Sequence, residues 1–87
     1  MNCVYLLRSL KDSKQYIGST SRGCETRLAE HNKGLVKSTK SRRPFKLVSY
    51  QPCKTIVEAA VLEKKYKRSS GALRRAIAKG QFIIVDK

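Results

Sequence analysis

Residues 3–8 (Cys-Val-Tyr-Leu-Leu-Arg) and residues 15–19 (Gln-Tyr-Ile-Gly-Ser) are two short segments rich in apolar, β-branched and aromatic side chains. Such side chains suit the pleated surface of a strand. The linking residues 11–14 (Lys-Asp-Ser-Lys) are polar, and Asp and Ser stabilise turns by bonding to their own backbone. The pattern therefore predicts a β-hairpin.

The predicted hairpin brings two tyrosines and a glycine together. Side chains alternate between the two faces of a strand. If the loop closes with an even number of residues, Tyr5, Tyr16 and Gly18 lie on one face of the sheet. Two phenols around a bare glycine predict a shallow polar floor, which is unusual for a core strand.

The length and composition indicate one small globular domain over residues 1–87, of which 40% are hydrophobic. No apolar run approaches the roughly 20 residues that span a bilayer, and the first residues do not resemble a cleaved signal peptide. Three widely spaced cysteines, Cys3, Cys24 and Cys53, fit reduced thiols better than a disulfide framework. We therefore expect an intracellular protein, in the cytoplasm, nucleoid or nucleus, with no membrane association.

The strongest compositional feature is the charge, because 20 Lys and Arg face 6 Asp and Glu and leave a net charge of +14. Such a field favours polyanions, either nucleic acid or an anionic membrane surface. Residues 33–46 hold many basic residues and no acid, and they read as a mobile basic arm. We expect nucleic acid as the partner, with its phosphates bound by Lys37, Lys40, Arg42, Arg43, Lys64 and Lys67.

The rest of the chain predicts three helices and one further strand. The first helix is expected over 23–33, capped by Ser19, Thr20 or Ser21 and ended by Gly34, and a strand follows over 46–50. The second helix is expected over 56–68 and opens with the capping box Thr55–Glu58. The third helix runs to about Lys79, with Gly80 as its stop and with Leu73, Ala76 and Ile77 inward. Residues 82–85 form either an edge strand or a segment packed over the core. These elements predict an α/β fold, a small three-stranded antiparallel sheet flanked by helices.

Glu63 stands out among the six acidic residues. Asp12 lies in a turn and Glu58 in a helix cap, whereas Glu63 has no local explanation other than an ion pair with Lys67 four residues on. A lone carboxylate is how Mg²⁺ typically binds when waters and a phosphate supply the other oxygens. Glu63 is therefore a candidate metal ligand.

Residues 3–5 (Cys-Val-Tyr) and 16–18 (Tyr-Ile-Gly) resemble the paired signature of the GIY-YIG nuclease superfamily. That group includes homing endonucleases and the nuclease half of the bacterial excision-repair incision enzyme. The resemblance extends to an arginine on the first helix, matched by Arg27, and a glutamate on a later helix, matched by Glu63. His31 stands where many members carry a polar residue one turn after the arginine.

The resemblance implies an endonuclease that hydrolyses phosphodiester bonds of DNA with Mg²⁺ or Mn²⁺, and a setting such as DNA repair. Tyr5 would deprotonate or orient the attacking water, and Tyr16 would hold the phosphate or the water. Arg27 would bind the scissile phosphate, Glu63 would hold the metal, and His31 would assist either tyrosine. A phenol with an ordinary pKa near 10 is a poor base at neutral pH, so its activation would need nearby positive charge.

Two departures from the family pattern leave alternatives open. Many members have Lys directly after the second triplet, where this chain has Ser19, and the only asparagines are Asn2 and Asn32, neither on a helix beyond Glu63. The same fold could therefore serve a non-catalytic nucleic-acid-binding module. A membrane-surface or structural basic protein is a weaker alternative, because no strongly amphipathic basic helix carries the charge. A protein partner or a second domain in another chain also remains open.

Overall fold

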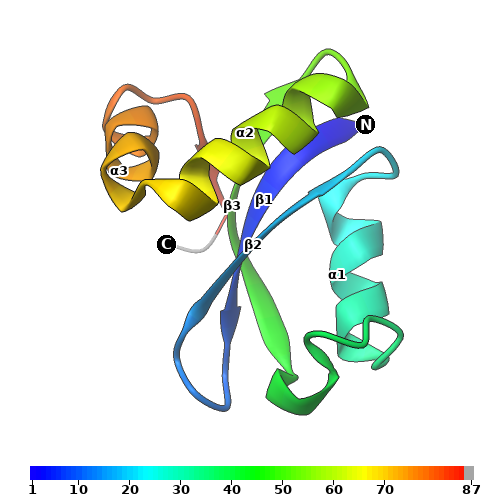
Figure 1. Cartoon of the computed structure of the whole chain (residues 1–87). Coiled ribbons are helices and arrows are strands. Elements are labelled where there is room, and N and C mark those ends of the chain that lie inside the picture. Colours follow the sequence, from blue (N-terminus) through cyan, green and yellow to red (C-terminus); the bar gives the residue numbers. More distant parts are fainter. Residues whose placement is uncertain (86–87) are drawn as a thin grey trace.

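The computed structural model describes residues 1–85, which fold into an antiparallel sheet with helices on both faces (Figure 1). The elements in chain order are β1 (Asn2–Ser9), β2 (Gln15–Thr20), α1 (Cys24–Asn32), a one-turn 3-10 helix η1 (Lys40–Arg42), β3 (Phe45–Cys53), α2 (Ile56–Arg68), α3 (Ser70–Ala78) and β4 (Ile83–Ile84). The strand order is β2-β1-β3-β4, and each neighbouring pair is antiparallel. The predicted fold class is confirmed.

The sheet has one strand more than predicted. Ile83 and Ile84 pair with Tyr50 and Ser49 at the outer edge of β3, so the tail forms an edge strand. A two-residue strand is too short to show any alternation, which is why the expected sheet had only three strands. Asp86 and Lys87, which follow this tail, lie outside the described residues.

Strand β1 lies at the centre of two apolar clusters. Val4 and Leu6 face α2 and α3, where they pack with Ala59, Tyr66 and Leu73. On the opposite face, alternate residues of β1 pack with residues of β3 and α1 in a second cluster. Its buried members are Cys3, Tyr5, Leu7, Cys24, Phe45 and Leu47. Because helices cover both faces, the central part of β1 is buried on both sides.

The hairpin forms as the alternation predicts. Tyr5 pairs with Gly18 and Leu7 pairs with Tyr16, so Tyr5, Tyr16 and Gly18 share the α1 face. In the turn, the Asp12 carboxylate accepts a hydrogen bond from the backbone N–H of Lys14 at 2.8 Å. The expected shallow floor is wrong, because Tyr5 is only 1% exposed and lies beneath α1.

The helix ends agree only in part with the predicted caps. No side chain caps α1, which begins after Gly23, so the expected role of residues 19–21 as caps is wrong. Thr55 caps α2 as predicted, although the Glu58 carboxylate accepts from the N–H of Lys54. The stops at Gly34 and Gly80 are confirmed, since both have a φ of +77°, which only glycine adopts without strain. Ile77 is 36% exposed and does not point inward.

The basic segment, residues 33–46, is held against the sheet and is not a mobile arm. Thr39 is fully buried, and the Arg42 side chain donates to Asp12 at 3.0 Å and lies 5.5 Å from the centre of the Phe45 ring. The sequence could not show the contact with Asp12, because Arg42 lies 30 positions away from it in the chain. Within residues 1–85, no helix is long and apolar enough to cross a membrane.

Candidate active site

A chain of buried hydrogen bonds begins at the Tyr5 hydroxyl. It lies 2.9 Å from Nε2 of His31, and Nδ1 of His31 lies 2.7 Å from the Thr39 hydroxyl. The Thr39 hydroxyl donates in turn to the carbonyl oxygen of Val36. Since Thr39 donates there, it accepts from Nδ1–H, and Nε2 is left to accept from the Tyr5 hydroxyl. The network thus assigns the tautomer of His31 and points the Tyr5 proton at its ring.

Burial sets the protonation state of both rings. Burial lowers the pKa of His31 to about 4, and the positive charge of Arg27 acts in the same direction. Burial also raises the pKa of Tyr5 to about 12, while Arg27 opposes this shift through hydrogen bonding and charge. At neutral pH His31 is therefore a neutral acceptor, and Tyr5 keeps its proton.

Tyr16 lies on edge strand β2, where its ring is close to residues of both α1 and α2. Its ring centre lies 5.2 Å from that of His31 and 6.4 Å from that of Phe45. The ammonium group of Lys67, on α2, lies 5.4 Å from the centre of the same ring. Tyr16 therefore has the buried imidazole on one side and an exposed cation on the other.

Arg27 lies beside Tyr5 and is oriented by an acid of its own helix. Its Nη1 atom lies 3.1 Å from Oε1 of Glu30, which also accepts from Arg22 at 2.7 Å. These two arginines hold the pKa of Glu30 below its usual range, with Arg27 the larger cause. Because 30% of the Arg27 side chain is exposed, its guanidinium can reach a bound anion.

Glu63 lies on the α2 side of the same edge. Its Oε1 atom accepts from the Ser19 hydroxyl at 2.5 Å, and its Oε2 atom lies 2.7 Å from the Lys67 ammonium group. The predicted ion pair with Lys67 is thus present. The negative charge of Glu63 contributes to the raised pKa of Tyr5, so the two side chains lie within electrostatic reach of each other.

The five candidate catalytic residues therefore gather at the β2 edge. Tyr5 and Tyr16 come from the hairpin, Arg27 and His31 from α1, and Glu63 from α2. Sequence reasoning missed Thr39, which fixes the imidazole, and the bond from Ser19 to Glu63. Neither has a local signal, because Thr39 lies in an aperiodic basic segment and Ser19 is 44 positions from Glu63.

Glu63 suits a hard divalent cation. Among residues 1–85 there is no group of three or more His, Cys, Asp or Glu side chains that could hold a metal ion. Mg²⁺ needs no such cage, since it usually takes one or two carboxylates and fills the remaining positions with water and substrate phosphate. A quarter of the Glu63 side chain is exposed, and a hydroxyl oxygen lies beside it. The donor set fits Mg²⁺ or Mn²⁺ and not a thiolate-rich zinc site.

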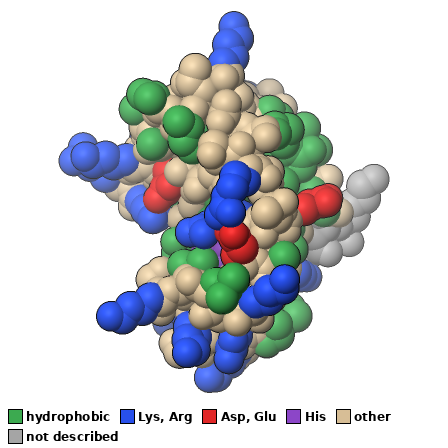
Figure 2. All heavy atoms as spheres, turned by 90° about the vertical axis from the view of Figure 1, so that its right-hand side faces the viewer, with side chains coloured by type: hydrophobic (Ala, Val, Ile, Leu, Met, Phe, Trp, Pro, Cys, Tyr) green, Lys and Arg blue, Asp and Glu red, His purple; other side chains and the backbone are tan. Residues whose placement is uncertain are grey.

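The predicted nucleic-acid contacts differ in accessibility. Lys37, Lys40, Arg43 and Lys64 are exposed, as is Lys67. Arg42 is half-buried and holds the hairpin turn through Asp12 and two backbone carbonyls, which gives it a structural role. Figure 2 shows Lys and Arg side chains spread over the face that α1 covers, with few acidic ones among them.

A hairpin with two tyrosines, an arginine on the first helix and a glutamate on the second are the features of a nuclease domain of the type that the sequence resembles. The family model of the GIY-YIG catalytic domain matches residues 1–76, and the chain therefore belongs to the GIY-YIG family. Domains of this family are typically endonucleases, and they generally use divalent metals. Neither the curated proteins nor the solved structures gave a match to the chain.

Proposed function

We propose that this protein is a divalent-metal-dependent endonuclease that hydrolyses phosphodiester bonds of DNA inside the cell, and that residues 1–87 form one catalytic domain. The observation that carries the proposal is the buried chain from Tyr5 through His31 to Thr39, with Arg27 beside the phenol. A core tyrosine needs only one partner for its hydroxyl. Here His31 and Arg27 both serve the phenol and Thr39 fixes His31 in turn, which is the arrangement expected of a positioned acid–base group.

Tyr5 is the group that orients the attacking water or removes its proton. Its O–H points at Nε2 of His31, so a lone pair of the phenol oxygen is left to accept a hydrogen bond from the attacking water. His31, neutral at pH 7, accepts the hydrogen bond of the phenol and fixes the direction of its O–H. A divalent cation at Glu63 would add positive charge that stabilises phosphoryl oxygens and favours ionised forms nearby.

Arg27 binds the scissile phosphate. Its guanidinium carries a fork of N–H donors that matches two phosphate oxygens. Glu30 holds this fork in the resting protein through one of its nitrogens, Nη1. The exposed remainder of the guanidinium can bind a phosphate without giving up that bond.

Lys67 supplies the positive charge for the phosphate that is missing at Ser19. Many family members carry Lys where this chain has Ser19, and here the Ser19 hydroxyl binds Glu63, which binds Lys67. The Lys67 ammonium group also lies over the ring of Tyr16, the second signature tyrosine. We infer that α2 delivers to the phosphate a cation that other members deliver from β2.

The DNA that flanks the cleavage site is bound by Lys37, Lys40, Arg43 and Lys64. Arg42 supports this binding indirectly, because it orders the hairpin turn. If about five phosphates are neutralised, the logarithm of affinity falls against the logarithm of salt with a slope of roughly −4 to −5.

Two observations favour the second candidate, a nucleic-acid-binding module without catalysis. Tyr5 is 1% exposed, and Glu63 already has Lys67 as its counter-charge. A module that only binds needs neither an accessible phenol nor a free carboxylate.

Cleavage and binding measured side by side separate the two candidates. Wild type, Tyr5→Phe and the control Tyr50→Phe are tested on branched and linear DNAs in Mg²⁺, in Mn²⁺ and in EDTA. The nuclease predicts cleavage by wild type and Tyr50→Phe, and a loss of ~10²-fold or more in Tyr5→Phe at nearly unchanged affinity. The binding module predicts no cleavage and at most the loss of one hydrogen bond, about 0.5–1.5 kcal/mol. Absence of cleavage by wild type on every DNA would overturn the proposed function.

A further inference from the structure

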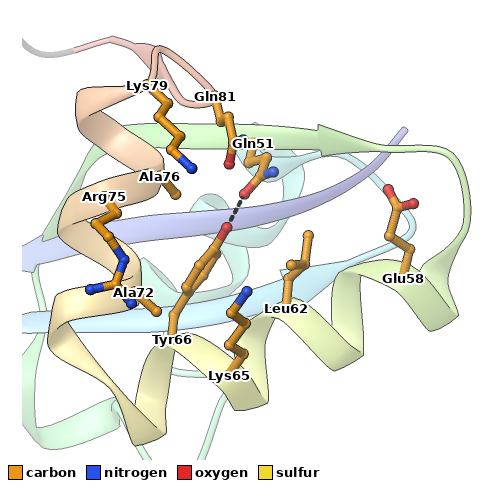
Figure 3. Close-up of a pocket in the computed structure, with 10 residues that line it drawn as sticks. All are labelled: Gln51, Glu58, Leu62, Lys65, Tyr66, Ala72, Arg75, Ala76, Lys79 and Gln81. Atoms are coloured by element: carbon orange, nitrogen blue, oxygen red, sulfur yellow. Dashed lines mark hydrogen bonds between the residues drawn. The ribbon is translucent and has the colours of Figure 1, made fainter.

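A hollow in the surface lies between α2, α3 and the end of β3 (Figure 3). Its volume is about 450 Å³, within the range of pockets that hold small ligands. Its lining includes three apolar residues, Leu62, Ala72 and Ala76. The hydroxyl of Tyr66 donates to Oε1 of Gln51 at 2.6 Å and fixes that side chain at the wall.

Cations surround this cavity. Lys65, Arg75 and Lys79 line it, all three are exposed, and within residues 1–85 no acidic side chain forms an ion pair with any of them. Of the described lining residues only Glu58 is acidic, and Figure 3 shows it at the opposite end from Arg75. Three like charges around one concavity raise the local concentration of anions.

Neutral donors complete the lining. Because Oε1 of Gln51 accepts from Tyr66, the amide NH₂ of Gln51 remains to donate toward a ligand. Gln81 brings a second side-chain amide from the segment that follows α3. Cations and amides beside a few apolar side chains suit a phosphorylated ligand that also carries a polar ring.

The cavity is separate from the candidate active site, although both use α2. Glu63 and Lys67 lie on the flank of α2 that faces β2. Lys65 is two residues from each, about 200° round the helix, and lies on the flank that faces α3. One helix thus carries a different site on each flank.

We propose that the cavity between α2 and α3 binds a phosphorylated ligand of nucleotide size, with the phosphate held by Lys65, Arg75 and Lys79. Two sources share this chemistry: a nucleotide within a DNA strand that extends past the candidate active site, and a free mononucleotide. The second source needs no nuclease activity, and binding to either is measured without metal. Failure of the proposed cleavage therefore leaves this inference standing.

Side-chain amide NMR signals of Gln51 and Gln81 test the proposal in EDTA. The probes are deoxyadenosine monophosphate, the nucleoside deoxyadenosine, and a short single-stranded oligodeoxynucleotide. We expect at least one phosphorylated probe to shift both amides and the nucleoside to leave them unchanged. Shifts from the oligonucleotide alone assign a DNA strand, and shifts from the mononucleotide assign a free nucleotide.

Two neighbouring arginines of α3 give the matched control. Arg75 lines the cavity and Arg74 does not, so Arg75→Gln and Arg74→Gln make the same change of charge at adjacent positions. Arg75→Gln should weaken binding of the phosphorylated probe that shifts the amides about tenfold, as expected for the loss of one charged hydrogen bond. Arg74→Gln should weaken that binding much less. Unshifted amides with both phosphorylated probes, or equal weakening by the two variants, would overturn the proposal.

Discussion

Tyr5 lies directly over Gly18, its partner across β1 and β2, so closely that a Cβ at position 18 would overlap the ring and hydroxyl of Tyr5. The glycine of the second signature triplet is thus required by the tyrosine of the first. Its missing side chain leaves the space in which the phenol reaches Nε2 of His31. The two triplets act as one structural unit, and the hairpin holds that unit in register.

Gly18→Ala should therefore damage the site from within the sheet. The added methyl group meets a packed ring between strand and helix, so the Tyr5 hydroxyl must move away from His31. We expect a loss of about 1–3 kcal/mol in the free energy of unfolding, typical of overpacking, and a fall of ~10²-fold in cleavage rate. Chemical denaturation and single-turnover cleavage measure the two effects.

Gly71→Ala is the matched control for Gly18→Ala. A Cβ at Gly71 would come closest to the end of the flexible Arg75 side chain, at 3.3 Å, and would meet Ser69 and Arg74 only at ordinary contact distance. Gly71 also lies in α3, where Ala is the better helix former. This variant should keep full cleavage and be as stable as wild type or slightly more so. If Gly18→Ala cleaves as fast as Gly71→Ala, the close packing of Tyr5 on Gly18 has no role in the site.

Glu63→Gln and Glu58→Gln should separate the two acids of α2. Glu63→Gln keeps the shape and removes the charge that would hold a cation, so cleavage should fall by ~10²-fold or more and Mn²⁺ binding by calorimetry should weaken. Glu58→Gln should cost about 1 kcal/mol or less of stability, because its carboxylate accepts from the N–H of Lys54 at the helix start, and should leave cleavage intact. The opposite pattern would show that the acids are wrongly assigned.

His31 should make stability depend on pH in a defined window. Its pKa is about 4 in the folded protein, against about 6.5 in an unfolded chain. Between these values the unfolded chain binds a proton that the folded protein refuses, so the free energy of unfolding falls as the pH falls from about 6.5 to about 4. The loss attributable to His31 should reach at most about 3 kcal/mol.

His31→Gln isolates that contribution, because glutamine does not titrate and still offers a donor and an acceptor. Urea denaturation between pH 4 and 7 should give a steeper decline for wild type than for the variant. His31 faces Tyr5, Tyr16, Phe45 and the Thr39 hydroxyl, with the charges of Arg27 and Glu30 nearby. Parallel declines would mean that His31 is not buried in its neutral form.

The parts of this fold that the sequence predicts are those with a local pattern. Period-two alternation places Tyr5 and Tyr16 on one face, and the spacing of four residues places Glu63 beside Lys67. Both are found in the structure. The features that could not be predicted depend on contacts between separate elements of the fold. Thr39 reaches His31 only once the basic segment folds back on α1, and β4 exists only because β3 offers it an edge.

Lys67→Met tests whether α2 supplies the missing phosphate charge, because methionine keeps much of the length of the side chain and removes the ammonium group. Lys67 now neutralises Glu63 at 2.7 Å, so its removal should tighten Mn²⁺ binding by about 2–5-fold, the scale of a partly exposed ion pair. At saturating Mn²⁺, cleavage should nevertheless fall about tenfold, since the phosphate loses a charged contact.

Lys64→Met is the control, because Lys64 is an exposed neighbour on the same helix. This variant should leave Mn²⁺ binding unchanged, and it should lower cleavage only as far as it weakens DNA binding. Adding Ser19→Lys to Lys67→Met should restore cleavage, because it returns a cation to the same edge from β2. If Lys67→Met cleaves as well as wild type at saturating metal, or if Ser19→Lys fails to rescue a defective Lys67→Met, the charge that Ser19 lacks is not supplied by Lys67.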